Sequence, residues 1–208
     1  MLEQGTPEWF AARLGRVTAS KISDVMSKGR GNAPSATRAN YMAQLVAERL
    51  TGEAAESYTN AAMQHGTETE PQARAQYTMR TGNVVQEVGF IPHPDGIHAG
   101  ASPDGLVGDD GLVEIKCPNT ATHIATLRGA SIDRKYLLQM QWQMICTGRA
   151  WCDFVSYDPR MPHELALKVQ RVHHDETLAG EISSAVSEFL GELEGLEADL
   201  RKIGQSTE

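Results

Sequence analysis

The segment SPDGLVGDDGLVEIKCP, residues 102–118, decides how this sequence is interpreted. Two short apolar runs flank a turn of glycines and aspartates, a pattern that predicts two adjacent β-strands. Successive side chains of a strand point to opposite faces, so Glu114 and Lys116 share one face and Ile115 lies on the other. The two strands would therefore bring Asp104, Glu114 and Lys116 together at one point.

These three side chains have the chemistry of a divalent-cation site. Hard cations bind carboxylate oxygens, and Mg²⁺ uses one or two protein carboxylates while keeping several waters. A bound ion can acidify a water and stabilise charge on a phosphodiester, and a second ion can hold the leaving oxygen. Lys116 would either deprotonate the water, which requires a lowered pKa, or stay cationic and stabilise the transition state.

Taken one at a time, the two halves of the motif are ordinary. Pro-Asp-Gly is a common turn, and Glu-Ile-Lys is typical of an exposed strand face. On two apolar strands, with the acids ten residues apart, Pro103-Asp104 and Glu114-Ile115-Lys116 match the PD-(D/E)XK nuclease pattern.

Helical patterns surround the strands, and the first of them begins at a hydroxyl cap, Thr6, followed by proline. The periodicity predicts a helix at about 7–14, a second that begins near Ser20 and a third over Tyr41 to Leu50. It predicts further helices at about 59–80, 120–128, 134–147 and 175–203. It predicts strands at 84–91, 98–107, 112–117, 151–157 and 165–172, the first three as a meander. This order predicts an α/β fold with a central mixed sheet flanked by helices, in a single domain of residues 1–208.

The last predicted helix, about 175–203, is amphipathic. Its apolar residues recur at alternating spacings of four and three, namely Ile182, Val186, Phe189, Leu193, Leu196, Leu200 and Ile203. Such a stripe can form an oligomer seam, but it covers barely three heptads, which favours a helix that packs on its own sheet.

The composition, with 40% apolar and 22% charged residues, is that of a globular protein. No apolar run approaches the roughly 18 residues that span a bilayer, and the start MLEQGTPEWF lacks signal-peptide features, so we expect a cytoplasmic protein without a membrane partner. Cys117, Cys146 and Cys152 fit neither a disulfide framework nor a CxxC metal site, so we expect reduced, buried thiols. The histidines lack zinc-binding spacing.

The net charge of −8 argues at first against a nucleic-acid partner. However, residues 174–208 hold nine acids against Arg201 and Lys202, so the first 173 residues carry a net charge of only −1. An acidic tail can lie outside while a basic surface lies elsewhere. The acidic balance therefore excludes little.

Beyond the nuclease motif, the sequence resembles the lambda exonuclease family of phage recombination nucleases, YqaJ-like members of the PD-(D/E)XK superfamily. Short matches occur in the same order along most of the chain. They are Trp9 with Arg13, Val17-Thr18-Ala19-Ser20, Gly66 to Ala73, Ser102-Pro103-Asp104-Gly105, Glu114-Ile115-Lys116-Cys117-Pro118, Tyr136 to Gln141 and Ser156-Tyr157-Asp158-Pro159-Arg160-Met161. The resemblance implies a restriction-endonuclease-like core.

The resemblance also implies an activity. Members are ring-shaped homotrimers that need Mg²⁺, with Mn²⁺ as a substitute ion and two ions in each site. They degrade one strand of linear duplex DNA in the 5′ to 3′ direction, preferring a 5′-phosphorylated end. The 3′ single strands left behind are the substrate of a single-strand annealing protein, the expected partner.

By position, the resemblance makes Asp104, Glu114 and the Ile115 carbonyl metal ligands. It makes Lys116 the water activator and Glu70 an accessory acid near a metal. Without the family, Glu70 cannot be told apart from other helical acids, such as its neighbour Glu68.

The helix at 134–147 would support the active site through Gln139 and Tyr136, one turn apart. Gln139 and Gln141 lie among apolar residues, and a buried glutamine must satisfy its amide, which favours a site role for both.

A third group of residues would contact the DNA. The resemblance places Arg13, Ser20 and Ser102 in a pocket for the terminal 5′-phosphate, which suits a guanidinium fork and hydroxyl donors. It makes Arg30 a loop residue that contacts DNA, and it puts Met63 where the family has an apolar wedge between the separating strands.

Three other classes of protein compete with this one, and the iron–sulfur nuclease is nearly excluded. A PD-(D/E)XK endonuclease or junction resolvase would share the metal site but would cut circular DNA. An iron–sulfur nuclease needs four cysteine ligands, and this chain has three. A non-catalytic DNA-end-binding protein is disfavoured by the complete set of acid, acid and lysine.

Overall fold

The computed structural model describes residues 3–29, 35–55 and 61–206, without the side chains of residues 61–63. The helices are α1 (Pro7–Arg13), the 3₁₀ turn η1 (Ala19–Lys21), α2 (Ile22–Val25), α3 (Ala36–Thr51), α4 (Ala61–Thr81), α5 (Thr120–Leu127), α6 (Arg134–Thr147) and α7 (Glu176–Gln205). The strands are β1 (Val17–Thr18), β2 (Val85–Gln86), β3 (Ile91–Pro92), β4 (Ala99–Ala101), β5 (Gly105–Val107), β6 (Gly111–Lys116), β7 (Trp151–Tyr157) and β8 (Leu167–His173).

The main sheet has five strands in the order β2-β5-β6-β7-β8. β6 and β7 run parallel, and the other neighbours are antiparallel, so the predicted mixed sheet is confirmed. The parallel pair is joined through α5 and α6, which is the long crossover that parallel strands need.

The predicted meander is present in part, as the antiparallel neighbours β2, β5 and β6. Strands β1, β4 and β3 form a separate three-stranded sheet, and the run predicted at 98–107 divides between the two sheets as β4 and β5. The division falls at Pro103, which has no amide hydrogen to donate to a ladder. β1, which has only two residues, is too short to show a periodicity.

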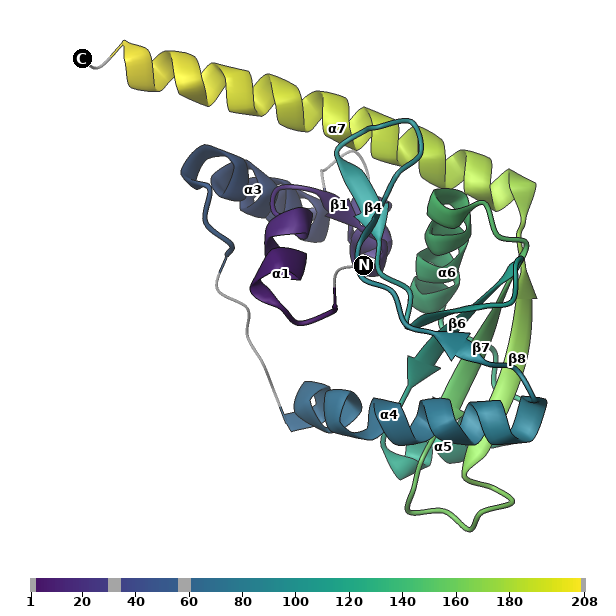
Figure 1. Cartoon of the computed structure of the whole chain (residues 1–208). Coiled ribbons are helices and arrows are strands. Elements are labelled where there is room, and N and C mark those ends of the chain that lie inside the picture. Colours follow the sequence, from purple (N-terminus) through teal and green to yellow (C-terminus); the bar gives the residue numbers. More distant parts are fainter. Residues whose placement is uncertain (1–2, 30–34, 56–60, 207–208) are drawn as a thin grey trace.

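Two helices cover the two faces of the main sheet (Figure 1). Ala73 and Tyr77 of α4 pack in one apolar cluster with Val113 and Ile115 of β6. On the other face, Met140 and Met144 of α6 pack with Leu112, Cys152 and Phe154. β6 is therefore buried between α4 and α6 along most of its length.

The helix boundaries follow local capping chemistry. The Asp133 side chain caps α6 by accepting from the Lys135 amide, and Gly148 ends the helix at a φ of 67°. Ser35 and Gly52 cap α3 in the same two ways. These caps set where the two helices begin and end.

The terminal helix α7 packs on α2, α3 and α6, so the predicted packing on the sheet is wrong (Figure 1). The first part of its stripe, from Ile182 to Leu193, is buried. Leu196, Leu200 and Ile203 lie beyond this contact and are 40%, 38% and 64% exposed.

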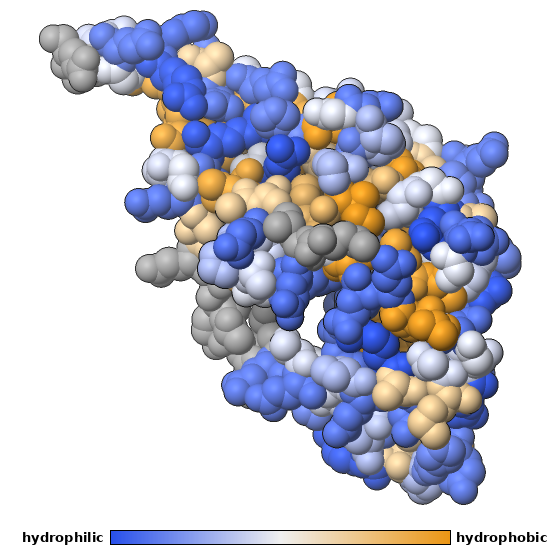
Figure 2. All heavy atoms as spheres, in the orientation of Figure 1, coloured by the Kyte–Doolittle hydropathy of each residue, from blue (hydrophilic) through white to orange (hydrophobic). Residues whose placement is uncertain are grey.

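In Figure 2 the molecule is hollowed between α1 and α4, and hydrophilic residues edge the hollow. Figure 1, in the same orientation, shows β6 ending beside this region. None of the helices in the described part of the chain has the length and apolar character needed to cross a membrane.

Candidate active site

Strand β6 determines where the central acid points. Val113 and Ile115 face α4, so the alternation of the strand turns Glu114 toward α6. The Glu114 side chain is fully buried, and Lys116, at the end of the strand, is 28% exposed. The predicted alternation of Glu114, Ile115 and Lys116 is present.

Three donors surround the Glu114 carboxylate. Its Oε1 accepts from Lys116 Nζ at 2.5 Å and from Gln139 Nε2 at 2.6 Å. Its Oε2 accepts from Gln143 Nε2 at 2.7 Å. These donors replace the hydrogen bonds to water that the carboxylate loses on burial, and all three come from β6 and α6.

Asp104 follows Pro103 and is the residue immediately before β5. Its Oδ2 accepts a hydrogen bond from the Ile115 amide at 2.6 Å. The β5–β6 register pairs Gly105 with Val113, and its next step places Asp104 opposite Glu114. The sheet thus brings the two acids of the motif together.

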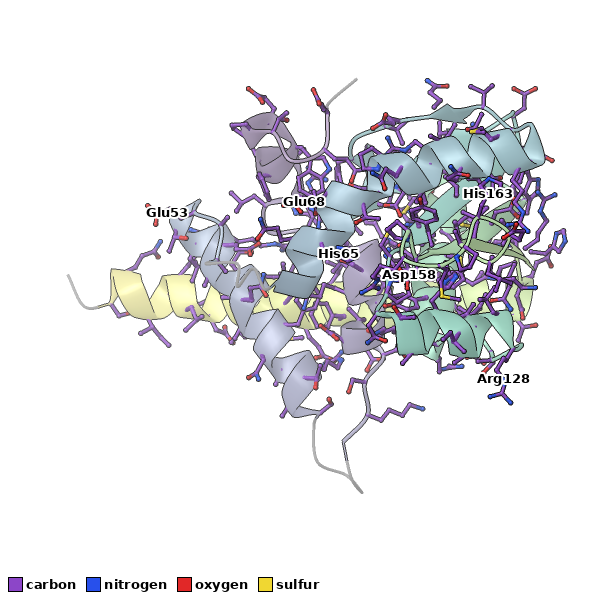
Figure 3. All side chains as sticks on the ribbon, turned by 90° about the horizontal axis from the view of Figure 1, so that it is seen from below. Glu53, His65, Glu68, Arg128, Asp158 and His163 are labelled. Atoms are coloured by element: carbon purple, nitrogen blue, oxygen red, sulfur yellow. The ribbon has the colours of Figure 1, made fainter. Side chains whose placement is uncertain are left out.

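Glu70 joins them from α4. It pairs with Arg74 one turn later at 2.6 Å, and its pKa responds to the charges of Glu114 and Lys116. Glu68 is exposed on the same helix and accepts from Gln64 instead (Figure 3). The structure thus separates two acids that the sequence alone leaves equivalent. We refer to Asp104, Glu114 and Glu70 as the acidic cluster.

Ionisation is disfavoured for two acids of the cluster. Burial and the nearby Glu114 and Glu70 charges raise the pKa of Asp104 well above its usual range, against the opposing effect of Lys116. Burial also raises the pKa of Glu70 despite its pairing with Arg74. For Lys116, burial acts to lower the pKa, but the Glu114 and Asp104 charges outweigh it and raise the pKa. Lys116 is a cation in this arrangement.

A divalent cation fits this donor set. Among the described residues, no three Asp, Glu, His or Cys side chains lie close enough to form a ready-made ligand cage. Mg²⁺ does not require one, because it binds through one or two carboxylates and keeps several waters. The raised pKa values of Asp104 and Glu70 mark a place where added positive charge is favourable.

Tyr136 covers the lysine. The Nζ atoms of Lys116 and Lys135 lie 5.2 Å and 4.7 Å from the centre of its ring. The ring itself lies beside Phe154 of β7, with 5.7 Å between ring centres. Tyr136 and Gln139, the two residues predicted on α6, are therefore both at the acidic cluster.

A cavity of about 190 Å³ contains Arg13 and Ser20 in its wall, and we refer to it as the arginine cavity. The Arg13 guanidinium lies 4.0 Å from the centre of the Trp9 ring, and its Nη1 is 3.4 Å from Ser102 Oγ. Trp9 Nε1 donates to the same hydroxyl at 3.0 Å. The three residues predicted for a phosphate pocket thus lie in and around one cavity.

Burial lowers the pKa of Arg13, with Tyr41 and Glu48 acting weakly in the opposite direction. Arg13 is a half-buried cation, which is the character of an anion-binding residue. Ser102, which Arg13 contacts, is two residues from Asp104, so the Cα atoms of Ser102 and Asp104 are at most about 7 Å apart.

Two predicted residues cannot be placed. Arg30 lies outside the described residues, and so does the side chain of Met63. Their roles stay predictions.

The prediction of a site role for Gln141 is wrong. Its amide bonds the His173 carbonyl and the Asp175 amide, which joins α6 to the start of α7. A helix turns about 200° over two residues, so Gln139 and Gln141 cannot share a face. The residue that shares the face of Gln139 is Gln143, four positions later. Gln143 also lies among apolar residues, so the requirement to satisfy a buried amide applied to it equally. Its spacing of four residues from Gln139 is the sequence feature that would have identified it.

The matching segment Ser156–Met161 contains the end of β7 and the turn that follows it. Asp158, fully buried, accepts from Arg160 Nε at 2.7 Å beside the start of α5 (Figure 3). Burial acts to raise the pKa of Asp158, but hydrogen bonds from Arg160 and Thr120 hold it at about 2. Arg160 also donates to the Pro118 carbonyl, which fixes the chain just after Lys116.

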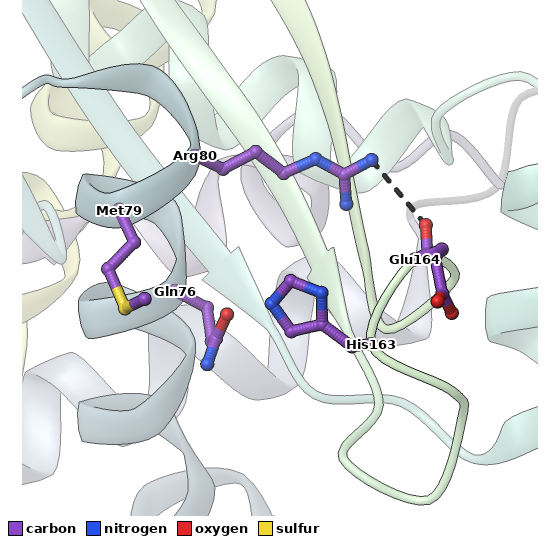
Figure 4. Close-up of a pocket in the computed structure, with 5 residues that line it drawn as sticks. All are labelled: Gln76, Met79, Arg80, His163 and Glu164. Atoms are coloured by element: carbon purple, nitrogen blue, oxygen red, sulfur yellow. Dashed lines mark hydrogen bonds between the residues drawn. The ribbon is translucent and has the colours of Figure 1, made fainter.

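A larger cavity, of about 320 Å³, lies away from the acidic cluster. Gln76, Met79 and Arg80 of α4 line it with His163 and Glu164 from the β7–β8 loop (Figure 4). Arg80 is engaged with the Leu167 and Glu164 carbonyls. The larger volume does not make this cavity the candidate active site, because none of the acids of the cluster lines it.

Comparison with known proteins places the chain in a family. Residues 8–150 match the YqaJ-like viral recombinase domain. A search of curated proteins found no match. Among solved structures, the alkaline exonuclease LHK-Exo from Laribacter hongkongensis is 53% identical, with 98% of this chain and 100% of that chain covered at a TM-score of 0.90.

Two further structures are similar. LHK-Exo in complex with dAMP matches with the same identity and coverage at a TM-score of 0.91. A phage related exonuclease from Haemophilus somnus 129PT has the same fold at 16% identity, with 89% of this chain and 96% of that chain covered at a TM-score of 0.68. The fold is thus the restriction-endonuclease-like α/β fold, as predicted. The chain belongs to the YqaJ-like viral recombinase family, which is lambda-exonuclease-like.

Proposed function

We propose that this chain is a Mg²⁺-dependent exonuclease that degrades one strand of linear duplex DNA in the 5′ to 3′ direction from a 5′-phosphorylated end. The observation that carries the proposal is the short Ser102–Asp104 segment, because Ser102 contacts Arg13 of the arginine cavity and Asp104 belongs to the acidic cluster. A terminal phosphate held by Arg13 would place the adjoining phosphodiester at the acids. The 53% identity to an alkaline exonuclease supports the same class of reaction.

The residues divide the work by their chemistry. Asp104, Glu114 and the Ile115 carbonyl would hold the first ion, with Glu70 near a second. When bound, Mg²⁺ supplies charge neutralisation at the phosphodiester and acidifies water. Lys116 remains beside Glu114 as a cation, so in this structure it is suited to orient the attacking water and to stabilise developing negative charge.

Arg13 and Ser102 would orient the DNA end. A guanidinium fork binds two phosphate oxygens at once, and Trp9 holds this fork by stacking against it. An end bound in this way fixes the direction in which the enzyme proceeds.

We further propose that residues 1–208 act as one nuclease domain within a homotrimer. A closed ring around DNA would keep the enzyme on its substrate between cuts. The product would be a 3′ single-stranded overhang for phage-type recombination, taken up by a single-strand annealing protein.

Two alternatives predict different products. An endonuclease or resolvase with the same acids would nick a closed circle, and a non-catalytic end-binding protein would cut nothing. The arginine cavity favours the exonuclease, because an enzyme that cuts within a duplex has no terminal phosphate to bind.

The decisive experiment compares linear duplex with a 5′-phosphate, linear duplex with a 5′-hydroxyl, and a covalently closed circle, each with Mg²⁺ or chelator. Separate labels on the 5′ and 3′ ends report the direction of digestion. We expect Mg²⁺-dependent loss of the linear DNA alone, fastest with the phosphate, with the 5′ label released first. Nicking of the circle would support the endonuclease, and no cutting the end-binding protein.

A further inference from the structure

Glutamines 139 and 143 hold the two oxygens of Glu114 separately. They lie four positions apart on one face of α6, and each donates its amide to a different oxygen of the carboxylate. Because Lys116 also binds Oε1, the carboxylate is fixed at both oxygens and cannot rotate about its last bond.

The hydrogen-bond count leaves one position open on Glu114. A carboxylate accepts at about four lone-pair positions, two on each oxygen. Lys116 and Gln139 occupy both positions on Oε1, and Gln143 occupies one on Oε2. The remaining acceptor position is therefore on Oε2, the oxygen that Gln143 holds.

Gln143 is an unfavourable residue for the stability of the folded state. Its side chain is completely buried, and its Oε1 has no hydrogen-bond partner among the described residues. A carboxylate accepts only from the amide NH₂ group, so Glu114 forces the amide oxygen toward a side that offers no donor. An unpartnered buried oxygen destabilises the folded state, and an apolar side chain of similar size would avoid that loss. Local conflicts of this kind are expected at functional sites.

We propose that Gln143 is a positioning residue that orients Glu114 to bind the divalent cation through Oε2. The proposal rests on the cation of the proposed function. Partners that orient a metal ligand typically change metal affinity by about 10- to 100-fold when they are removed. Gln143 would act in this way through the carboxylate, without touching the cation or the DNA.

The chain supplies its own control. Gln141 is a buried glutamine on the same helix, two residues away, but it faces the α6–α7 junction and bonds His173 and Asp175. Gln141→Met and Gln143→Met each replace a buried amide by a thioether of similar length. Only the second removes a donor from Glu114.

The test titrates the full-length protein with Mn²⁺ alone, without DNA, and measures free Mn²⁺ by electron paramagnetic resonance. Thermal unfolding in chelator is measured on the same samples. We expect Gln143→Met to raise the Mn²⁺ dissociation constant about tenfold or more. We expect Gln141→Met to lower the melting temperature and leave the dissociation constant unchanged. Gln143→Leu, which also lacks a donor, replaces Gln143→Met should that variant not fold.

The outcomes separate the two proposals. A wild-type protein that binds no Mn²⁺ would contradict the metal site of the proposed function. Normal Mn²⁺ binding by wild type and by both Gln143 variants, with only the melting temperature lowered, would show that Gln143 is structural. An equal rise of the dissociation constant in Gln141→Met would show that any buried amide of α6 has the effect, and would also overturn the proposal.

Discussion

The acidic cluster and Arg13 of the arginine cavity are linked through the Ser102–Asp104 segment and differ in the sign of the charge that their side chains can carry. On one side, burial and mutual repulsion raise the pKa values of Asp104 and Glu70. On the other, burial lowers the pKa of Arg13, which shares its cavity with hydroxyl groups, an aromatic ring and Glu48, whose charge acts in the opposite direction. Ionisation is thus disfavoured for the acids on one side and for an arginine on the other.

This difference shows what each region is suited to bind. A cation would relieve the repulsion in the acidic cluster, and a phosphate would neutralise Arg13. The two charges do not cancel each other, because the Arg13 guanidinium contacts Ser102 and Trp9 instead of an acid of the cluster. A phosphorylated DNA end with its divalent cation carries both complementary charges.

The largest expected effect comes from the acidic side. Lys116→Ala should lower the rate of cutting by about 10²- to 10⁴-fold, because it removes the cation that orients water and balances developing charge. Binding of a 5′-phosphorylated duplex in chelator, measured by fluorescence anisotropy, should be unchanged, since the arginine cavity is intact.

Lys135→Ala is the matched control for this variant. Lys135 lies over the same Tyr136 ring but is 54% exposed and pairs only weakly with Asp133. It should cut at the wild-type rate. A loss of binding in Lys116→Ala as large as its loss of cutting would assign Lys116 to the DNA-binding surface.

The next effect comes from the arginine cavity and should change selectivity more than maximal rate. Arg13→Ala should lower the ratio of rates on 5′-phosphate and 5′-hydroxyl ends by about 10- to 100-fold, the value of a lost charge-assisted hydrogen bond. Arg13→Lys should retain part of the preference, because it keeps the charge and loses the fork.

Arg128→Ala tests whether the loss of any arginine lowers the ratio of rates on the two kinds of end. Arg128 is at the far end of α5, outside the residues that line the arginine cavity (Figure 3). It should leave the ratio of rates unchanged. An unchanged ratio in Arg13→Ala would remove Arg13 from the phosphate pocket and end the comparison between the two regions.

The two regions also differ in how far sequence could predict them. Strand alternation and a turn of known type predict that three residues lie close together, namely Asp104, Glu114 and Lys116. Arg13 and Ser20 have no such local signal, and only the resemblance to a family selects them from other surface residues.

Residues that act through tertiary contacts were harder still to predict. Gln143 meets Glu114 across 29 positions of sequence, and only the packing of α6 on β6 brings them together. Glu70 and Glu68 differ only in their positions around α4, because Glu70 is on the side that faces the cluster and Glu68 is not. The division of β4 and β5 between two sheets depends on pairings of two or three residues, below the length at which periodicity is informative.

The smallest expected effect is on stability, and it tests whether the acidic cluster is under strain without its cation. Asp104→Asn keeps an oxygen for the Ile115 amide but removes a charge from the cluster. In chelator at pH 8 the variant should be more stable than wild type by about 1 kcal/mol, or a melting temperature about 2–4 °C higher. Asp109→Asn, in the exposed β5–β6 turn, should have no such effect.

The pH dependence of this difference follows from the direction of the pKa shift. Because the folded pKa of Asp104 is raised, the folded state binds the proton more tightly than the unfolded state. Wild-type stability should therefore fall as pH rises from about 4, the unfolded value, through the folded pKa, and Asp104→Asn should lack that loss. Mg²⁺ should then raise the wild-type melting temperature at pH 8 more than that of the variant. Parallel pH profiles for the two proteins in chelator would mean that neighbouring groups neutralise the acidic cluster, and would remove the proposed strain from this side of the comparison.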